Sequence, residues 1–315
     1  MFFLYALVKN TKMTEEETIS IPNTNDTVAF GDVNLFYNAS TRKKNDSTNK
    51  KRENIVVAIT KDAILASWYE NERWSNLKAA LFDYYRNLCG SEEIHSVNIE
   101  KKGGRTYTYD FLLEINGNDY KVEFKYGADM IGRIPQFVSP TKPSQYFSGS
   151  YEEFYYDKYL SKMELGVIIP AKDVWLSQVH QPSPECMTEI LCKYYGGCQK
   201  SSKYTGNEDD KLFYNNCKKL ASDSIKDFLK QTKLNKEELS KYLIGTQRGK
   251  HYMLFKNGQF HLDRINEETL TIQEIKKITK NYVLLKTNSG KELKVLLRWK
   301  NGNGVAYPAL QISLK

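Results

Sequence analysis

The segment DFLLEINGNDYKVEFKYG at residues 110–127 constrains the fold of this chain more than any other. Two runs rich in β-branched and aromatic residues flank Asn-Gly-Asn-Asp at 116–119, and Asn-Gly between such runs is a strong signal for a β-hairpin. Successive side chains of a strand point to opposite faces of a sheet. The predicted hairpin therefore has one apolar face and one face that carries acids and lysines.

Two registers fit this hairpin. A turn at 116–117 sets Asp110 opposite Glu123, whereas a turn at 117–118 sets Asp110 opposite Lys125. Either register puts Asp110, Glu123 and Lys125 on the same face. The opposite face then carries the apolar side chains of Phe111, Leu113, Ile115, Val122, Phe124 and Tyr126.

The polar face of the hairpin has two interpretations. Two carboxylates a few ångströms apart repel each other, and Mg²⁺ relieves that repulsion because it binds one or two carboxylates together with waters and phosphate oxygens. The ion could polarise a phosphoryl oxygen and lower the pKa of a bound water, while Lys125 orients that water or stabilises the developing charge. The alternative is a solvated face with an ordinary cross-strand pair. Acid-x-Lys recurs elsewhere in the chain, for example at Glu274 and Glu292, so only geometry singles out one copy.

A long amphipathic helix is predicted before the hairpin. Its apolar residues recur at spacings of three and four, and Gly90 follows as a stop signal. They are Trp74, Leu77, Leu81, Tyr84 and Leu88. Extending this stripe backward by four residues puts Glu70 on the core-facing side, whereas Glu72 falls off the stripe.

The rest of the chain predicts an α/β (α+β) fold with a mixed sheet and helices packed on it. Helices are expected at about 151–163, 183–195, 211–231 and 235–243, with an apolar strand LGVIIP at 165–170. From Tyr252 onward the pattern switches to strands, which predicts an additional C-terminal β-rich segment.

This C-terminal segment is basic. The chain has a formal net charge of +8, and residues 250–315 hold 12 Lys and Arg against 5 Asp and Glu. Phosphate backbones are a common partner of such a surplus. Arg298 and Lys300, with Arg248 and Lys250 in TQRGKHY, are therefore candidate contacts to DNA. A soluble surface whose lysines protect an exposed edge strand is the alternative interpretation.

Residues 1–54 are predicted to form a mobile arm. The stretch from about Thr14 to Asn54 is polar, first acidic and then basic, and order is expected to begin near Ile55. Such a segment buries too little apolar surface to offset the entropy lost on ordering. The arm either touches DNA or is solvated.

The chain is expected to be an intracellular, cytoplasmic protein without a membrane partner. Its five cysteines are odd in number and form no CxxC pair, which argues against a disulfide framework or a zinc ribbon. The apolar opening MFFLYALV lacks a basic flank and is far too short to span a bilayer. The four histidines are scattered, and no phosphate-binding glycine motif follows a strand.

Asp110, twelve intervening residues and then Glu123-Phe124-Lys125, on a hairpin that follows a long helix, resemble the core of the PD-(D/E)XK nuclease superfamily. Many type II restriction endonucleases belong to this superfamily. The resemblance implies a restriction-endonuclease-like mixed central sheet flanked by helices. It also implies Mg²⁺-dependent hydrolysis of DNA phosphodiesters, which leaves 5′-phosphate and 3′-hydroxyl ends.

The same resemblance assigns roles to residues. It implies Asp110 and Glu123 as metal ligands, the carbonyl of Phe124 as a further ligand, and Lys125 as the lysine beside the attacking water. Many members add a glutamate from a helix, for which Glu70 is the first choice and Glu72 the second. The residue before Asp110 is Tyr109 rather than the proline of the motif's name, which lowers the specificity of the match.

Two later segments are also similar to parts of restriction enzymes. IPQF at 134–137 resembles the stretch after the lysine strand and makes Gln136 a candidate contact, and LLRWKNGNGVAYPALQISL resembles C-terminal strands. The resemblance implies a nuclease domain at 55–315. Within it, a catalytic core is expected at about 55–180, a helical segment at 181–245 and a basic β-rich segment at 246–315.

The expected function is that of a type II site-specific deoxyribonuclease acting on double-stranded DNA. A homodimer is expected because such enzymes cut both strands at a symmetric site. A DNA repair or junction-resolving nuclease with the same core is one alternative. The other is a non-catalytic basic DNA-binding protein.

Overall fold

The computed structural model describes residues 14–38, 45–103, 106–134, 136–163, 166–182, 188–198, 207–300 and 302–315. It divides the chain into two compact units. Unit 1 comprises residues 1–133 and 249–264, and unit 2 comprises residues 134–248 and 265–315. Both contain helices and strands, so the predicted α+β class is confirmed. No helix in the described ranges is long and apolar enough to cross a membrane.

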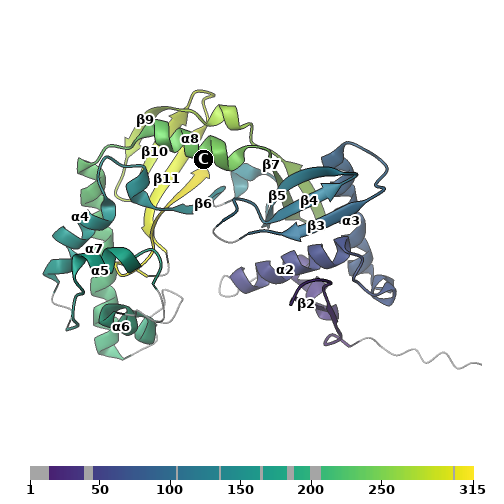
Figure 1. Ribbon diagram of the computed structural model, residues 1–315, viewed down its shortest axis with the longest axis horizontal. Helices are drawn as coiled ribbons and strands as arrows, with labels where there is room; N and C mark the ends of the chain where they lie inside the picture. Colours follow the sequence, from purple (N-terminus) through teal and green to yellow (C-terminus); the bar gives the residue numbers. More distant parts are fainter. Residues whose placement is uncertain are drawn as a thin grey trace, which may run out of the picture. The chain divides into compact units, whose positions relative to one another are not determined.

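Unit 1 is built on a mixed five-stranded sheet in the order β3-β4-β5-β7-β8 (Figure 1). The strands are β3 (Val97–Lys101), β4 (Phe111–Ile115), β5 (Asn118–Tyr126), β7 (Lys250–Lys256) and β8 (Gln259–Asp263). Strands β5 and β7 are parallel, and the other neighbours are antiparallel. Because β7 pairs with β5, residues 249–264 belong to unit 1, which differs from the expected boundaries at 180 and 246.

The β4–β5 hairpin has the first of the two predicted registers. Phe111 pairs with Val122 and Ile115 with Asn118, so the turn lies on Asn116-Gly117. The backbone φ angles of these two turn residues are 50° and 77°, the left-handed values that a two-residue hairpin turn requires. The apolar face is buried, as predicted, because Phe111, Leu113, Ile115, Val122 and Phe124 all point into the core.

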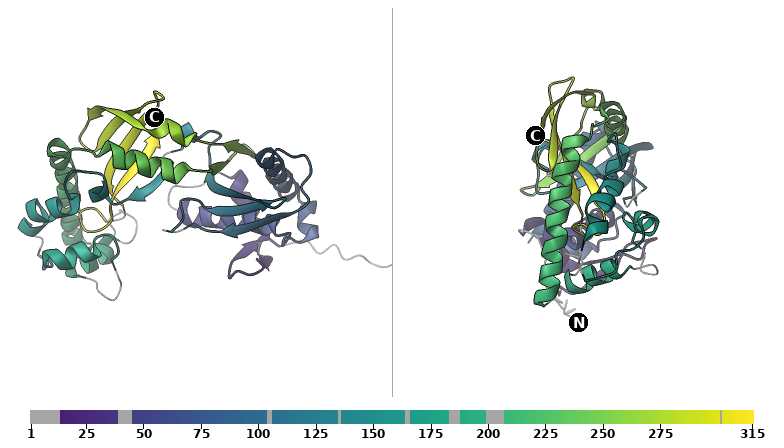
Figure 2. Two further views of the ribbon diagram at one scale, coloured as in Figure 1. Left: turned by 45° about the horizontal axis from the view of Figure 1, so that its top comes forward. Right: turned by 90° about the vertical axis from the view of Figure 1, so that its left-hand side faces the viewer.

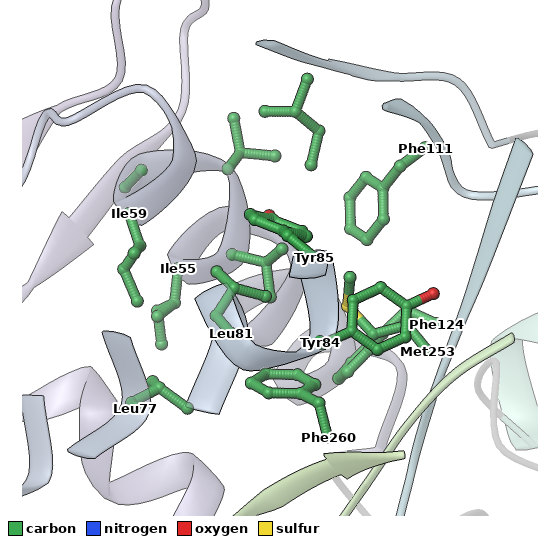
Figure 3. Close-up of a cluster of buried hydrophobic side chains, with 14 of the residues drawn as sticks. Ile55, Ile59, Leu77, Leu81, Tyr84, Tyr85, Phe111, Phe124, Met253 and Phe260 are labelled. Atoms are coloured by element: carbon green, nitrogen blue, oxygen red, sulfur yellow. The ribbon is translucent and has the colours of Figure 1, made fainter. Parts of the chain in front are cut away.

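Two helices, α2 (Asn45–Thr60) and α3 (Glu72–Cys89), form the core with this apolar face (Figure 3). All five residues of the predicted helix stripe are buried on α3. Asn71 caps the start of α3 by accepting a hydrogen bond from the Arg73 amide, and Gly90 ends it in the left-handed conformation. The predicted amphipathic helix is therefore confirmed from Glu72 onward.

The prediction of a mobile arm over residues 1–54 is wrong for the part of it that the structure describes. A small hairpin of β1 (Thr18–Ser20) and β2 (Thr27–Ala29) leads to α1 (Asn34–Tyr37) and then to α2. Arg52, counted as part of a solvated basic run, is 1% exposed and donates to the Leu35 carbonyl at 2.8 and 2.9 Å. The prediction failed because it used the average polarity of the segment. A few apolar residues and the buried guanidinium of Arg52 make enough contacts to order it. Residues 1–13 and 39–44 lie outside the described ranges.

Unit 2 contains a second five-stranded sheet in the order β6-β12-β11-β10-β9, and its neighbouring strands are all antiparallel (Figure 2). The strands are β6 (Val138–Thr141), β9 (Ile272–Ile278), β10 (Tyr282–Thr287), β11 (Glu292–Trp299) and β12 (Pro308–Leu314). The helices are α4 (Tyr151–Lys158), α5 (Lys172–Gln178), α6 (Glu189–Cys198), α7 (Glu208–Gln231) and α8 (Lys236–Gln247). Helix α7 packs on β11 and α8 on β9.

The helices expected in this part of the chain are confirmed with shifted ends, because α4 already ends at Lys158, α7 begins at Glu208, and α6 and α8 extend to Cys198 and Gln247. The strand predicted at 165–170 is wrong in its described part, because residues 166–170 form no strand and Ile168 is 74% exposed. An apolar run needs a neighbouring strand to pair with, and Gly166 at φ 64° together with Pro170 interrupts the extended backbone. Residues 183–187 of the next predicted helix lie outside the described ranges.

Candidate active site

The hairpin of unit 1 brings Asp110, Glu123 and Lys125 together, as the sequence predicts. Asp110 directly precedes β4, and its Oδ2 accepts a hydrogen bond from the Phe124 amide at 2.9 Å. The ammonium of Lys125 is hydrogen-bonded to Oε1 of Glu123. Asp110 is thus hydrogen-bonded to the backbone of Phe124, the residue between Glu123 and Lys125. The Phe124 carbonyl stays a prediction as a metal ligand, and the Phe124 ring lies in the core.

A second lysine, Lys250, lies at the same centre. It begins β7, is only 3% exposed, and donates from Nζ to the Thr108 carbonyl at 2.9 Å. The same Nζ lies 3.7 Å from Oε2 of Glu123. The prediction that Lys250 belongs to a basic DNA-facing surface is therefore wrong, because the parallel pairing of β7 with β5 buries its side chain beside Glu123.

A third carboxyl group, Glu53 on α2, faces this centre. The pKa of Glu53 is raised to about 7, first because the group is buried and second because Asp110 carries a charge of the same sign nearby. The charges of Lys101 and Lys125 act in the opposite direction. Glu53 is thus close enough to Asp110, Glu123 and Lys125 to interact with all three electrostatically.

Glu53 faces this centre, whereas the structure places neither of the two predicted glutamates on a buried helix face. Glu70 is exposed and lies in a short 3₁₀ turn (Ala66–Glu70), because α3 begins only after its Asn71 cap. Extending the stripe of α3 back to Glu70 was therefore wrong, and the second choice, Glu72, is exposed in the first turn of α3.

The electrostatics of the centre follow from crowding similar charges away from water. Burial, and then the negative charge of Glu123, raise the pKa of Asp110 to about 6. Burial lowers the pKa of Lys250 below its ordinary value. Burial acts in the same direction on Lys125, but the charges of Glu123 and Asp110 more than offset it and raise its pKa. The lysines only partly compensate the three carboxyl groups.

The remaining predicted DNA contacts belong to unit 2. The Arg298 guanidinium is half-buried on β11 and donates to the side-chain oxygen of Gln311 at 2.9 Å, and Gln311 is bonded in turn to Gln136. Arg248 and Lys300 are exposed. The structure therefore places Gln136 in a side-chain network of unit 2, whereas Asp110 belongs to unit 1.

The oxygen donors of this centre match what Mg²⁺ binds. Asp110 and Glu123 supply two carboxylates, and burial together with the charge of a neighbouring acid raises the pKa values of Asp110 and Glu53. Among the described residues, no three His, Cys, Asp or Glu side chains form a ready-made metal cage. Mg²⁺ needs no such cage, because it keeps several waters and is held by one or two carboxylates together with substrate oxygens. The residues therefore fit this ion.

Comparisons of the chain with protein-family models, curated proteins and solved structures found no match. The functional interpretation therefore rests on the geometry of this centre. Sequence reasoning missed Glu53 and the buried position of Lys250. The available signal for Glu53 was its place directly before the apolar run NIVVAIT, only two residues before Ile55, where order was expected to begin.

Proposed function

We propose that the protein is an Mg²⁺-dependent DNA endonuclease of the PD-(D/E)XK type, and specifically a type II restriction enzyme that cuts double-stranded DNA as a homodimer. One observation carries the proposal. The carboxylate of Glu123 contacts both Lys125 and the buried Lys250, beside an Asp110 whose pKa is raised. Buried charges are costly to maintain, and clusters of them with shifted pKa values are typical of functional sites.

The residues have distinct parts in hydrolysis. Asp110 and Glu123 would hold the ion, which would supply a charge to polarise a phosphoryl oxygen and to lower the pKa of a bound water. Lys125 has its ammonium beside Glu123, where it can orient a water and stabilise the charge that develops on the phosphoryl group. Glu53, with a pKa of about 7, can hold or release a proton at its carboxyl group near neutral pH.

Lys250 has a positioning part in this scheme. Its Nζ links the Thr108 carbonyl, two residues before Asp110, to the Glu123 carboxylate on the next strand. The two acids come from separate strands, so such a link restricts their relative movement. Fixed positions of charged groups contribute to catalysis because the groups need not reorganise during the reaction.

A plasmid-cleavage assay tests the proposal. The purified protein should cut supercoiled plasmid with Mg²⁺, and EDTA should stop the reaction. Glu123→Ala and Lys125→Ala should each lower the rate on the order of 10³-fold or more, while a mobility-shift assay shows that DNA binding survives. Glu292→Gln is the matched control, because Glu292 also pairs with a lysine, Lys276, but in unit 2.

Cutting at the normal rate by both unit 1 variants would overturn the assignment. The fragments from a long DNA then distinguish the biological roles. Discrete fragments support restriction, whereas a preference for branched DNA supports the repair or junction-resolving alternative. Binding without any cutting under Mg²⁺ supports a DNA-binding protein without catalytic activity.

A further inference from the structure

The chain that leads into Asp110 carries two neighbouring aromatic rings on its surface. The ring centroids of Tyr107 and Tyr109 are 5.5 Å apart and their planes are tilted by 59°. Tyr107 is 42% exposed, which places it among the large exposed side chains of the described residues. Exposure on this scale leaves ring surface available to a ligand.

Two lysines accompany these rings. Nζ of Lys102 lies 5.3 Å from the ring centroid of Tyr107, and Nζ of Lys121 lies 6.0 Å from that of Tyr109. We call the four residues Lys102, Tyr107, Tyr109 and Lys121 the tyrosine platform. Aromatic faces combined with ammonium groups are what proteins use to bind unpaired nucleotides, since bases stack on the rings and phosphates attract the cations.

The backbone of the platform is tied to the candidate active site. Thr108, between the two tyrosines, accepts a hydrogen bond from Lys250 at 2.9 Å, and the same Nζ lies 3.7 Å from Glu123. The amide of Lys102 donates to the carbonyl of Asp110 at 2.8 Å, and Gly103 donates to Tyr109 at 3.0 Å. The backbone at Lys102 and at Thr108 is thus held against Asp110 and Lys250 of the candidate site.

We propose that the tyrosine platform binds the base of an unstacked nucleotide within one or two positions of the scissile phosphate. The inference rests on the proposed function, because it takes the acids beside the platform to mark the point of cutting. A base can lie on a tyrosine ring only when it has left the duplex stack. In a duplex substrate the base must therefore be flipped out of the stack at the cut, and DNA that is already unpaired there, such as a single-stranded tail, a flap or a bubble, binds more tightly because it does not bear that cost.

The test measures DNA affinity in the non-cutting Glu123→Ala background. Two probes of the same sequence are compared, a blunt duplex and the same duplex with a short single-stranded tail. Adding Tyr107→Ala or Tyr109→Ala should weaken binding of the tailed probe by roughly 5- to 100-fold and leave blunt-duplex binding unchanged. Tyr107→Phe and Tyr109→Phe keep the rings and should retain the preference for the tail.

Tyr282→Ala is the matched control. Its ring also has a lysine above it, with Nζ of Lys294 at 4.6 Å from the centroid, but the pair lies in unit 2. This variant should affect both probes equally. A fluorescent adenine analogue in the tail supplies a second measurement, because stacking on Tyr107 should quench its emission in the parent and not in Tyr107→Ala.

The inference is overturned if the alanine variants bind both probes as the parent does, or lose affinity for both equally while their melting temperatures match that of the parent. The two proposals fail separately. If the protein cuts DNA with Mg²⁺ but the tyrosine variants bind as the parent does, the nuclease proposal stands and the proposal for the tyrosine platform is refuted. If the tyrosines bind the single-stranded tail but the protein never cuts DNA, the platform is a binding surface and the nuclease proposal is refuted.

Discussion

The two units use the same pair of residue types in opposite environments. In unit 1 the side chains of Glu123 and Lys250 are 10% and 4% exposed, whereas in unit 2 those of Glu292 and Lys276 are 31% and 40% exposed. A pair in contact with water contributes little, because solvent screens the attraction and two long side chains lose freedom. A buried pair changes the pKa values around it and is costly to break.

This difference shows that the density of basic residues along the chain does not indicate where the candidate active site lies. The basic surplus lies at 250–315, mostly in unit 2, where much of it is used on the sheet surface. Lys276 pairs with Glu292 across strands, Lys286 lies 3.9 Å from Glu274, and Arg298 is held by Gln311. The proposed catalytic centre uses two lysines, of which Lys250 is removed from water and Lys125 is partly exposed.

The largest difference in stability between the two units is expected from a substitution at Lys250. Lys250→Met should lower the free energy of unfolding by about 2–4 kcal/mol, because it leaves the buried Glu123 less compensated and the Thr108 carbonyl without its donor. Lys286→Met, the matched change in unit 2, should leave stability unchanged. Urea unfolding followed by circular dichroism measures both, and equal effects would show that burial does not distinguish the two units.

The pH dependence of stability should sharpen the same contrast. The pKa values of Asp110 and Glu53 are raised to about 6 and about 7 from ordinary values of 3.8 and 4.5. Groups with raised pKa values favour the folded state at low pH, and this contribution is lost as the pH rises through the folded values. The melting temperature of the protein in EDTA should therefore fall from about pH 5 to about pH 8.

A substitution at Glu53 and the addition of Mg²⁺ identify the groups that cause this fall in melting temperature. Glu53→Gln should reduce it, because the variant has no carboxyl group to ionise at position 53, and Mg²⁺ should reverse part of it at the higher pH by binding the ionised acids. Glu292→Gln serves as the control, since the pKa of Glu292 is lowered rather than raised. A fall that is the same in the parent and in Glu53→Gln would contradict the placement of Glu53.

The contribution of Glu53 to cutting should be smaller than that of the central acids. Glu53→Gln should lower the rate of plasmid cleavage by roughly 10- to 100-fold, the size of effect typical of groups that support metal ligands. Glu70→Gln should cut at the parental rate, because Glu70 is exposed in the turn before α3. A loss in Glu70→Gln without one in Glu53→Gln would restore the choice made from the sequence.

The smallest effect is expected on the surface of unit 2. Lys300→Ala should weaken DNA binding a fewfold for any sequence and reduce the salt dependence of affinity by about one counterion, as expected for an exposed lysine that contacts a phosphate. The rate at saturating DNA should not change. A mobility-shift titration at several salt concentrations checks the slope, and an unchanged slope would show that Lys300 does not contact the DNA.

Much of unit 1 could be predicted because its signals are local. The Asn116-Gly117 turn defines the hairpin, strand alternation puts Asp110, Glu123 and Lys125 together, and the stripe of α3 continues to Gly90. The start of α2 was missed because residues 14–54 are mostly polar, and a prediction from composition gives little weight to the few apolar residues among them. The buried Arg52 shows that a charged residue can belong to a core when it finds a carbonyl to bond.

The sequence by itself therefore determined the hairpin, its polar face and three residues of the candidate site, since these depend on the two-residue period of a strand and on one turn. Only the tertiary structure decided which glutamate joins them and what Lys250 does. Glu53 is far along the chain from the hairpin, and Lys250 follows more than a hundred residues after Lys125. Their environments depend on the packing of α2 and on the parallel pairing of β5 with β7, contacts that no local pattern encodes.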